Sequence, residues 1–258
     1  MKLISLNIWG GRAYGPFMEF VRTHAVDTDI FCFQEVLSSP SHNVLPHGAH
    51  ANILGELTAV LPNFDMHFAP EQDGYDLDDM VDFNISMGQA TFTRKSHSVD
   101  SADSVFVYRE RNKGEDRYTI PSNFEYTRLS FGGKAFTIAN IHGIPYPGSK
   151  IDTPERLEQS RRINEFFSQE KGAKIICGDF NLLPETESVK MLENTGMMNL
   201  IKTYHIPETR SRLSSYYGKP QYLKFADYVF VSREVNVHDF RVPSIGVPDH
   251  LPMILEFS

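Results

Sequence analysis

Short apolar runs alternate along the chain with stretches in which apolar residues recur at helical spacing. This alternation is typical of an α/β protein. The runs predict strands at 2–8, 29–33, 64–69, 87–93, 104–109, 123–131, 134–141, 173–178, 226–231, 235–241 and 251–257. The helical spacing predicts helices at 16–25, 51–61, 153–170 and 186–195. Because the strands are many and the helices few, we expect two sheets packed face to face with the helices outside.

A turn signal and a capping signal support particular elements. Gly132 and Gly133 lie between two predicted strands. A Gly-Gly pair favours a tight hairpin turn, so we expect at least part of one sheet to be antiparallel. Thr153 can cap the helix at 153–170, and Pro154 suits its first position. This helix is therefore the most clearly bounded of the four.

The composition is that of a globular domain. The chain has 258 residues, of which 41% are hydrophobic and 22% charged. It contains no repeat, low-complexity linker or change in composition, so we expect a single domain over residues 1–258. No apolar run approaches the ~18 residues of a membrane helix, which argues against a spanning protein.

The first residues and the cysteines indicate a cytoplasmic protein. Residues 1–9 contain Ser and Asn and are too short in apolar sequence for a signal peptide, so we expect them to form the first strand. Cys32 and Cys177 each lie in an apolar run. This placement predicts two buried, reduced thiols rather than a disulfide framework.

The charge balance limits the classes of ligand that the chain is expected to bind. The net charge of −8 is unlike that of a general polyanion binder, although a bound divalent cation would let the chain accept a phosphate substrate. Residues 71–82 hold six acidic residues and no basic one, and residues 109–117 mix four basic with three acidic residues. Each segment is either a solvated surface loop or the border of a substrate groove, and both interpretations stay open.

Polar residues recur where the predicted strands end or begin. In chain order they are Asn7, Gln34-Glu35, His142, Gly178-Asp179-Phe180-Asn181, Asp227 and Asp249-His250. In a sheet with antiparallel neighbours, the end of one strand lies beside the beginning of another. We therefore expect these groups to share one edge of the sheets, where α/β proteins commonly bind ligands.

The shared chemistry of this set favours a magnesium-type site. Asn, Asp and Glu offer hard oxygen donors that suit Mg²⁺ or Mn²⁺, and such a site commonly also binds substrate phosphate oxygens. Two histidines with acidic partners can move protons near neutral pH. The chain has no zinc-ligand spacing, no Gly-x-Ser-x-Gly elbow and no Gly-x-x-x-x-Gly-Lys phosphate loop.

As an ordered set, these segments resemble the motifs of the endonuclease/exonuclease/phosphatase superfamily. The matching segments are Ser5-Leu6-Asn7-Ile8-Trp9, Gln34-Glu35-Val36, Asn140-Ile141-His142-Gly143, Gly178-Asp179-Phe180-Asn181, Ala226-Asp227-Tyr228 and Pro248-Asp249-His250. The resemblance covers residues 3–257 and implies a four-layered α/β sandwich, in which two mixed sheets are flanked by helices. The motifs are specific for the superfamily and not for a substrate.

The resemblance implies a metal site and a histidine pair. Glu35 would be the principal Mg²⁺ ligand, with Asn7 supporting the metal or a phosphate oxygen. Asp249 would be a further metal ligand in the closing Asp-His pair. His250 would contact the scissile phosphate or its attacking water, and Asp227 would hold and polarise His250.

Further roles follow from the same resemblance. Asp179 and Asn181 would orient the water and stabilise the charged transition state. His142 matches the branches of the superfamily with a histidine at this position, and it would donate to a non-bridging oxygen or assist the leaving group. Pro248 stands where the closing pair is usually preceded by Ser, and we expect the loop's approach to change without loss of activity.

Two residues outside the motifs are candidates for substrate binding. Arg210 either lies near a phosphate or is an exposed loop arginine. Trp9, the single tryptophan, either stacks on a base or leaving group or packs at the rim of the site.

The predicted function is hydrolysis of a phosphate ester by in-line attack of water, with Mg²⁺ or Mn²⁺ as cofactor. We expect a monomeric or weakly associating cytoplasmic enzyme, and no stable protein partner is evident. A nucleic-acid phosphodiester is the first substrate class. The alternatives are a small phosphate ester or phospholipid headgroup, or a binding protein that kept the fold and lost the chemistry.

Overall fold

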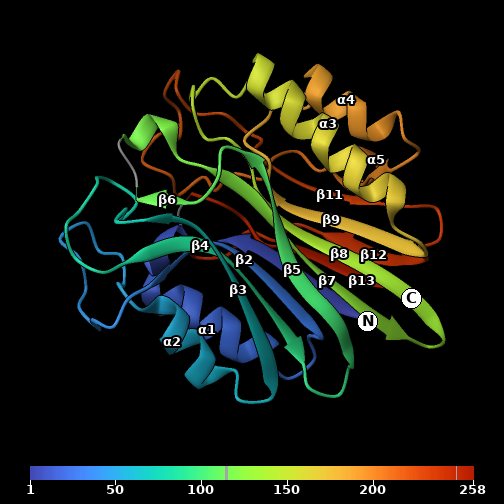
Figure 1. The fold of residues 1–258 in the computed structure, drawn as a ribbon, viewed down its shortest axis with the longest axis horizontal. Helices are drawn as coiled ribbons and strands as arrows, with labels where there is room; N and C mark the ends of the chain where they lie inside the picture. Colours follow the sequence, from blue (N-terminus) through green and yellow to red (C-terminus); the bar gives the residue numbers. More distant parts are fainter. Residues whose placement is uncertain (114–115, 248) are drawn as a thin grey trace.

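The strands form two mixed sheets in the computed structural model, which describes residues 1–113, 116–247 and 249–258 (Figure 1). The first sheet has the order β12 (Val237–Arg241), β13 (Met253–Phe257), β1 (Lys2–Asn7), β2 (Ile30–Ser38), β4 (Ser86–Arg94), β3 (Phe64–Asp73) and β6 (Asn112–Lys113). The second has the order β10 (Met198–Asn199), β11 (Asp227–Val231), β9 (Ala173–Asp179), β8 (Lys134–His142), β7 (Ser122–Phe131) and β5 (Val99–Tyr108). The pairs β1·β2, β3·β6 and β8·β9 are parallel, and the other pairs in these sheets are antiparallel.

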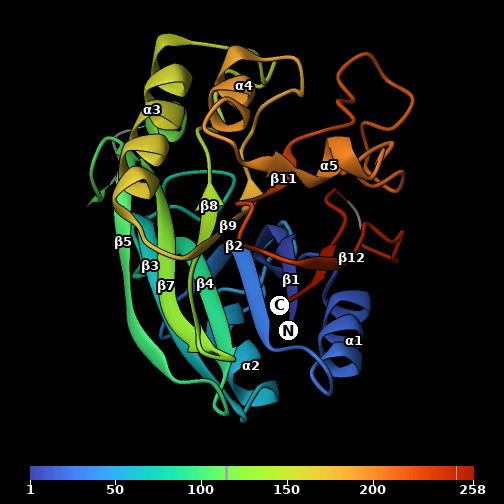
Figure 2. The ribbon, with the colours of Figure 1, turned by 90° about the vertical axis from the view of Figure 1, so that its right-hand side faces the viewer.

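Helices cover the outer faces of both sheets, so the fold has the four layers that the sequence predicts. The helices α1 (Tyr14–His24) and α2 (Ile53–Val60) lie on the first sheet (Figure 1). The second sheet carries α3 (Pro154–Gln169), α4 (Glu187–Glu193) and α5 (Leu200–Thr203), as Figure 2 shows from the side. Two short 3-10 turns, η1 (Trp9–Gly11) and η2 (Arg117–Thr119), complete the elements.

The alternation of side chains along each strand builds two apolar cores. Leu3 and Cys32 join a core that also contains side chains of the second sheet and of α3, whereas Ile4 and Phe33 join the core beneath α1 and α2. The side chains of successive strand residues point to opposite faces of the sheet. A strand that is covered on both faces therefore has a continuous apolar run in its sequence. Cys32 and Cys177 are free and buried, which confirms the predicted thiols.

A polar contact joins the two sheets beside the candidate site. Gln34 Nε2 of β2 donates to Asn140 Oδ1 of β8 at 2.6 Å. Asn140 Nδ2 in turn lies within hydrogen-bond distance of the Phe33 and Ala90 carbonyl oxygens, at 3.2 and 3.3 Å. Because both side chains are buried, this bond holds β8 in register against β2 and β4.

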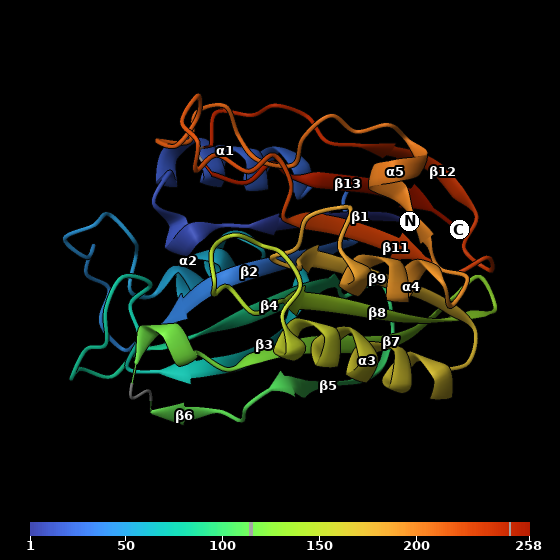
Figure 3. The same ribbon diagram turned by 90° about the horizontal axis from the view of Figure 1, so that it is seen from above.

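The predicted helices and long strands are confirmed to within a few residues. The short elements β6, β10 and α5 were not predicted, because two to four residues carry too little periodicity. Thr153 caps α3 by accepting a hydrogen bond from the Arg156 amide at 3.3 Å. Both termini lie at the end of the sandwich where β1 starts (Figure 3). No helix in the described part of the chain has the length and apolar character needed to cross a membrane.

Three predicted strand boundaries were wrong. The strand expected at 104–109 begins five residues earlier, at Val99, as β5. The strand expected at 29–33 continues to Ser38 as β2, because a bulge between Phe33 and Val36 absorbs the polar pair at 34–35. The strand expected at 64–69 continues to Asp73 as β3. The sequence places its last residues in the acidic segment at 71–82, because a buried acidic residue cannot be told from a solvated one by sequence alone.

Candidate active site

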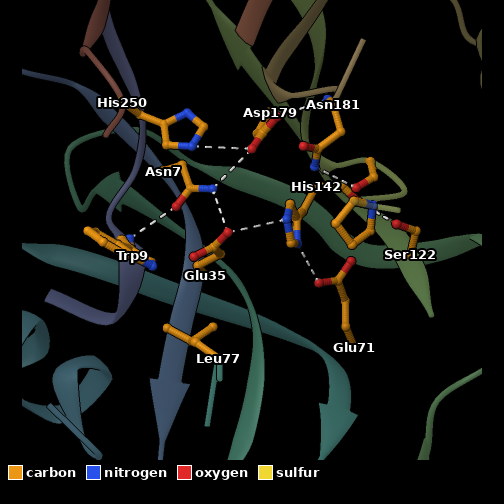
Figure 4. Close-up of polar contacts among 12 residues, drawn as sticks. Asn7, Trp9, Glu35, Glu71, Leu77, Ser122, His142, Asp179, Asn181 and His250 are labelled. Carbon is orange, nitrogen blue, oxygen red and sulfur yellow. Dashed lines mark hydrogen bonds and ion pairs between the residues drawn. The ribbon is translucent and has the colours of Figure 1, made fainter. Parts of the chain in front are cut away.

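The polar residues predicted at the strand ends converge on one edge of the sandwich (Figure 4). Asn7 ends β1, and Glu35 lies at the bulge of the parallel neighbour β2. In the second sheet, Asp179 at the end of β9 pairs in register with His142 on one side and Asp227 on the other. The expected shared edge is therefore present.

Asn7 connects the two sheets at the floor of the site. Its Nδ2 donates to Glu35 Oε1 at 3.0 Å and to Asp179 Oδ2 at 3.1 Å. Its Oδ1 accepts a hydrogen bond from the Trp9 backbone amide at 3.0 Å, which defines the orientation of the side-chain amide. Glu35 has a φ of 54°, and this bulged backbone presents its carboxylate at the edge of the sheet.

His142 is held by a buried carboxylate that the sequence did not suggest. Glu71 of β3 lies with Oε2 2.9 Å from His142 Nδ1, and its Oε1 accepts hydrogen bonds from Gln89 and Asn123 at 3.0 Å. Glu71 is fully buried, so the interpretation of residues 71–82 as one solvated loop is wrong at this position. The signal for Glu71 in the sequence was the predicted apolar strand at 64–69, which ends just before it.

The protonation of His142 follows from these neighbours. Burial lowers the pKa of His142, but the negative charges of Glu71, Glu35 and Asp179 outweigh it and raise the pKa to about 9. The second ring nitrogen, Nε2, lies 3.6 Å from Glu35 Oε1 and is a buried atom without a hydrogen-bond partner in the described structure. A protonated His142 therefore has an unused N–H beside Glu35.

His250 and Asp227 form a second histidine–carboxylate pair. His250 Nδ1 lies 2.8 Å from Asp227 Oδ1, as the sequence predicts. Its Nε2 lies 3.6 Å from Asp179 Oδ2 and 3.4 Å from Asp249 Oδ2. Burial and the Arg210 cation lower the pKa of His250, but the three carboxylates outweigh them and raise it to about 10.

Arg210 belongs to the site and is not an exposed loop arginine. Its side chain is 14% exposed. Its Nη2 donates to the Asp249 carboxylate, and its Nη1 lies 3.0 Å from His250 Nε2. The pKa of Asp249 is held well below its usual range: burial opposes this shift, but His250, Arg210 and Lys150 outweigh burial. Pro248, the neighbour of Asp249, lies outside the described residues.

Asn181 links the site to a lysine that the sequence did not suggest. The Asn181 amide N–H donates to Asp179 Oδ1 at 2.8 Å, and its Nδ2 donates to the Gly143 carbonyl at 2.9 Å. Its Oδ1 accepts a hydrogen bond from Lys150 Nζ. Burial lowers the pKa of Lys150, and Asp179 opposes this shift. No motif marks Lys150, because it comes from a loop that only the fold brings to the site.

A glycine before a polar pair is commonly a turn residue, but Gly178, which precedes Asp179, is not at a turn. It lies inside β9 with a φ of 136°. A Cβ built there would lie 2.1 Å from the Ile141 carbonyl oxygen on the neighbouring strand β8. Glycine is therefore required by the close approach of two parallel strands.

The donor set fits a divalent metal ion. Ligand atoms of Glu35, His142 and Asp179 lie within 4.8 Å of one another, and so do those of Asp179, Asp227 and His250. Carboxylate oxygens are the preferred ligands of Mg²⁺, and Glu35 and Asp179 supply them to the same space from the two sheets. Asp179 belongs to both clusters, whereas the Asp249 carboxylate is engaged by Arg210.

Trp9 and the acidic segment meet at the rim. The Arg12 guanidinium stacks over the Trp9 ring with its Cζ 4.3 Å from the ring centroid, and its Nη2 donates to Asp78 Oδ1 at 2.7 Å. Leu77 lies beside the same turn in Figure 4. The acidic segment after β3 thus borders the site. Of the segment at 109–117, Arg111 pairs with Asp73, and residues 114–115 lie outside the described structure.

The structure is thus a helix-flanked pair of mixed sheets with carboxylates, an amide and two histidines gathered at one edge. Residues 4–256 match the sequence profile of the Endonuclease/Exonuclease/phosphatase family, and the chain belongs to this family. Family members are hydrolases that act on phosphate esters. The resemblance seen in the ordered motifs is confirmed.

Solved structures share the fold over the whole chain. A family protein from Leptotrichia buccalis has a TM-score of 0.74 at 17% identity, covering 100% of this chain and 99% of that one. A Bacteroides thetaiotaomicron mannosyl-6-phosphatase has a TM-score of 0.71 at 18% identity, covering 100% and 99%. The human nocturnin catalytic domain with bound sulfate has a TM-score of 0.64 at 20% identity, covering 100% and 93%. A search of curated protein sequences finds no match.

Proposed function

We propose that this chain is a divalent-metal-dependent phosphoesterase that hydrolyses its substrate by in-line attack of water on phosphorus. The observation that carries the proposal is the convergence of Glu35 and two histidine–carboxylate pairs on Asp179. Phosphoryl transfer depends mainly on positioning and on neutralising charge, and this arrangement supplies groups for both.

Mg²⁺ is the cofactor that the donor set suits, with Mn²⁺ as the alternative. Glu35 would hold the ion with Asn7 and Asp179 beside it, and the bound ion would supply positive charge against the phosphate oxygens. The proposed role of Asp249 as a further ligand falls to its Oδ2, because its Oδ1 accepts a hydrogen bond from Arg210.

The residues around the phosphate have distinct proposed roles. Asp227 fixes the His250 ring so that Nε2 points to Asp179 and Asp249, where it can contact the phosphate or the attacking water. Asp179, whose Oδ1 is already fixed by the Asn181 amide, can accept a proton from that water. The unpartnered N–H of a protonated His142 can donate to a phosphate oxygen.

A small phosphate ester is the substrate class that the charges favour. The net charge is −8, and the acidic segment containing Asp76, Asp78 and Asp79 lies at the rim of the site. An acidic rim repels a polyanion such as nucleic acid, whereas a small ester carries fewer charges and experiences less of this repulsion. The similarity in fold to a protein described as a mannosyl-6-phosphatase agrees with this preference.

A nucleic-acid phosphodiester, the first class that the sequence suggests, is the second candidate. The observation in its favour is the Trp9 ring at the rim with the Arg12 guanidinium over it. An aromatic ring beside a cation is a common platform for a base.

The test is hydrolysis by the purified protein of supercoiled plasmid, a labelled single-stranded oligonucleotide and synthetic phosphate mono- and diesters. Millimolar Mg²⁺ and a chelator control would be run side by side. Asp249→Asn is expected to lower turnover by ~10²–10³-fold, because it removes a charged group from the reacting centre. Asp65→Asn, at an exposed position of β3, is the matched control and keeps wild-type turnover.

The outcomes separate the candidate functions. Chelator-sensitive cleavage of the oligonucleotide or plasmid would establish a nuclease, and cleavage of the synthetic esters alone would establish the small-ester enzyme. Wild-type turnover in a folded Asp249→Asn protein would overturn the catalytic assignment. Absence of turnover on every ester would leave the binding-protein alternative.

A further inference from the structure

A cavity of about 610 Å³ opens against the side of the site formed by Lys150 and Arg210. Its walls include Tyr216, Tyr222 and Leu223. The volume lies within the ~300–1,000 Å³ usual for small-molecule pockets, and a mostly apolar wall with a few polar groups is their usual lining. The two cations contact the catalytic residues on one side and the cavity on the other.

Lys150 has hydrogen-bonding capacity that the protein does not use. Its side chain donates to Asn181 Oδ1, and the described residues offer its ammonium group no second hydrogen bond. The residue is only 9% exposed, so bulk water cannot fully replace the missing partners. An ammonium has three N–H donors, and a buried one with unused donors is suited to an anionic ligand.

The loop that carries Lys150 is rigidly anchored. The buried guanidinium of Arg156 on α3 donates to the carbonyl oxygens of Pro147 and Ile151, both at 2.7 Å. The Lys150 backbone has a φ of 55°, and its carbonyl accepts a hydrogen bond from the Leu183 amide at 2.9 Å. The position of the ammonium is therefore set before a ligand arrives, which lowers the entropic cost of binding.

Arg210 is the second fixed cation. Its backbone carbonyl accepts a hydrogen bond from the Tyr222 hydroxyl at 2.9 Å, which ties the cavity wall to the site. Its guanidinium is held by Asp249 and lies against His250. Two cations thus face the space beside His250, in addition to the charge that a bound metal would supply.

The number of charges discriminates between ester types. Near neutral pH a phosphate monoester carries close to two negative charges, whereas a diester carries one. A pair of buried cations stabilises the dianion more than the monoanion, because electrostatic interactions are strong in a desolvated site. Tyrosine side chains line the cavity, and an aromatic ring in such a wall suits a ring-bearing alcohol such as a sugar or nucleoside.

We propose that Lys150 and Arg210 form a clamp that selects phosphate monoesters, and that the cavity lined by Tyr216 and Tyr222 holds the ring-bearing alcohol. The proposal rests on the proposed function and narrows its substrate class. In the reaction, the oxygen of water forms the new P–O bond and the P–O bond to the alcohol breaks. The alcohol leaves with the proton that water loses, and inorganic phosphate remains.

The test compares p-nitrophenyl phosphate, a monoester, with bis-p-nitrophenyl phosphate, a diester, in the presence of Mg²⁺. Lys150→Met is expected to lower kcat/KM for the monoester by ~10²-fold, in line with the loss of one charged donor. The loss of kcat/KM for the diester should be at least ~10-fold smaller, because the diester carries one charge fewer. Lys219→Met removes an exposed lysine of the adjoining loop and is the matched control, with both rates unchanged.

Each result has a defined meaning. Equal losses for the two esters in Lys150→Met would overturn the clamp and leave the proposed function standing. No Mg²⁺-dependent hydrolysis of either ester by the wild-type protein would instead overturn the proposed function. A wild-type protein that cleaves diesters and not monoesters would also reject the clamp.

Two measurements keep the proposal testable if Lys150→Met does not fold. Inorganic phosphate should inhibit the wild-type enzyme at least ~10-fold more strongly than dimethyl phosphate, since only the former is a dianion. Equal inhibition would overturn the clamp. Tyr216→Ala should raise KM more for glucose 6-phosphate and a nucleoside 5′-monophosphate than for methyl phosphate, and an equal effect on all three would reject the cavity as the alcohol site.

Discussion

At the scale of single residues, buried carboxylates set the protonation of the two histidines. Glu71 accepts three hydrogen bonds, from His142, Gln89 and Asn123, and is fully buried. Its hydrogen bond to His142 Nδ1 leaves Nε2 directed at Glu35. The carboxylate therefore determines both the orientation of the ring and the charge that the ring carries.

Glu71→Gln should lower the pKa of His142 from about 9 toward its ordinary value of ~6.5, because burial then has less negative charge opposing it. NMR titration of the histidine ring protons in metal-free protein would measure the change, with His142→Gln used to assign the signal. Glu185→Gln, at an exposed position, is the control. An unchanged pKa in Glu71→Gln would contradict the assigned pairing.

The same shift has a signed effect on stability. A histidine whose pKa is raised on folding contributes stability below its unfolded pKa and loses that contribution as the pH rises through its folded pKa. The wild-type free energy of unfolding should therefore fall between pH ~6.5 and about 9, through the titration of His142. In Glu71→Gln, urea unfolding should show a shallower fall over this range.

At the scale of elements, helix α3 positions the loop that carries Lys150. Arg156 lies in the first turn of this helix and is fully buried, although arginine is seldom a core residue. Its guanidinium satisfies carbonyl groups of the loop, including those of Ile144, Pro147 and Ile151. Gln159 of the same helix accepts a hydrogen bond from the Ile144 amide at 2.9 Å.

Arg156→Leu should destabilise the protein by ~3–4 kcal/mol, because it leaves several buried carbonyl groups without a donor. It should also lower ester hydrolysis, since the loop would no longer hold Lys150 against Asn181. Arg161→Leu on the exposed face of the same helix should cost less than ~1 kcal/mol, as expected for surface ion pairs. Urea unfolding of both variants checks this, and equal effects would contradict the anchoring role.

At the scale of the whole molecule, the candidate active site lies where the two sheets meet. Asn7 joins β1 to Asp179 of the other sheet, and Gln34 joins β2 to Asn140. The carboxylates collected there repel one another in a chain that already has a net charge of −8. A divalent cation at this junction would reduce the repulsion and connect both halves of the sandwich.

Saturating Mg²⁺ should therefore stabilise the folded protein, by ~2.7 kcal/mol at a hundred times its dissociation constant. Glu35→Gln should lose most of this gain, and Glu185→Gln should keep it. Thermal or urea unfolding, with NaCl at matched ionic strength to account for screening, measures the difference. The same gain in Glu35→Gln as in the wild type would show that the ion does not bind at Glu35.

Local patterns were enough to predict the order of the long elements and the family. The hydrophobic period identifies strands and helices because it depends on neighbours within a few residues, as at β8 and α3. Asn7, Glu35 and Asp179 were predicted because each follows an apolar strand and belongs to an ordered motif. Arg210 lies outside these motifs, so the sequence left it as one of two interpretations.

The remaining features depend on contacts between distant parts of the chain. Glu71 and Lys150 act on His142 and Asn181 across 71 and 31 positions of sequence, and no local pattern marks either pairing. The requirement for glycine at position 178 comes from the close approach of β8, which only the tertiary structure shows. The charge of a buried group and the shape of a pocket arise from side chains that only folding brings together, so they had to come from the tertiary structure.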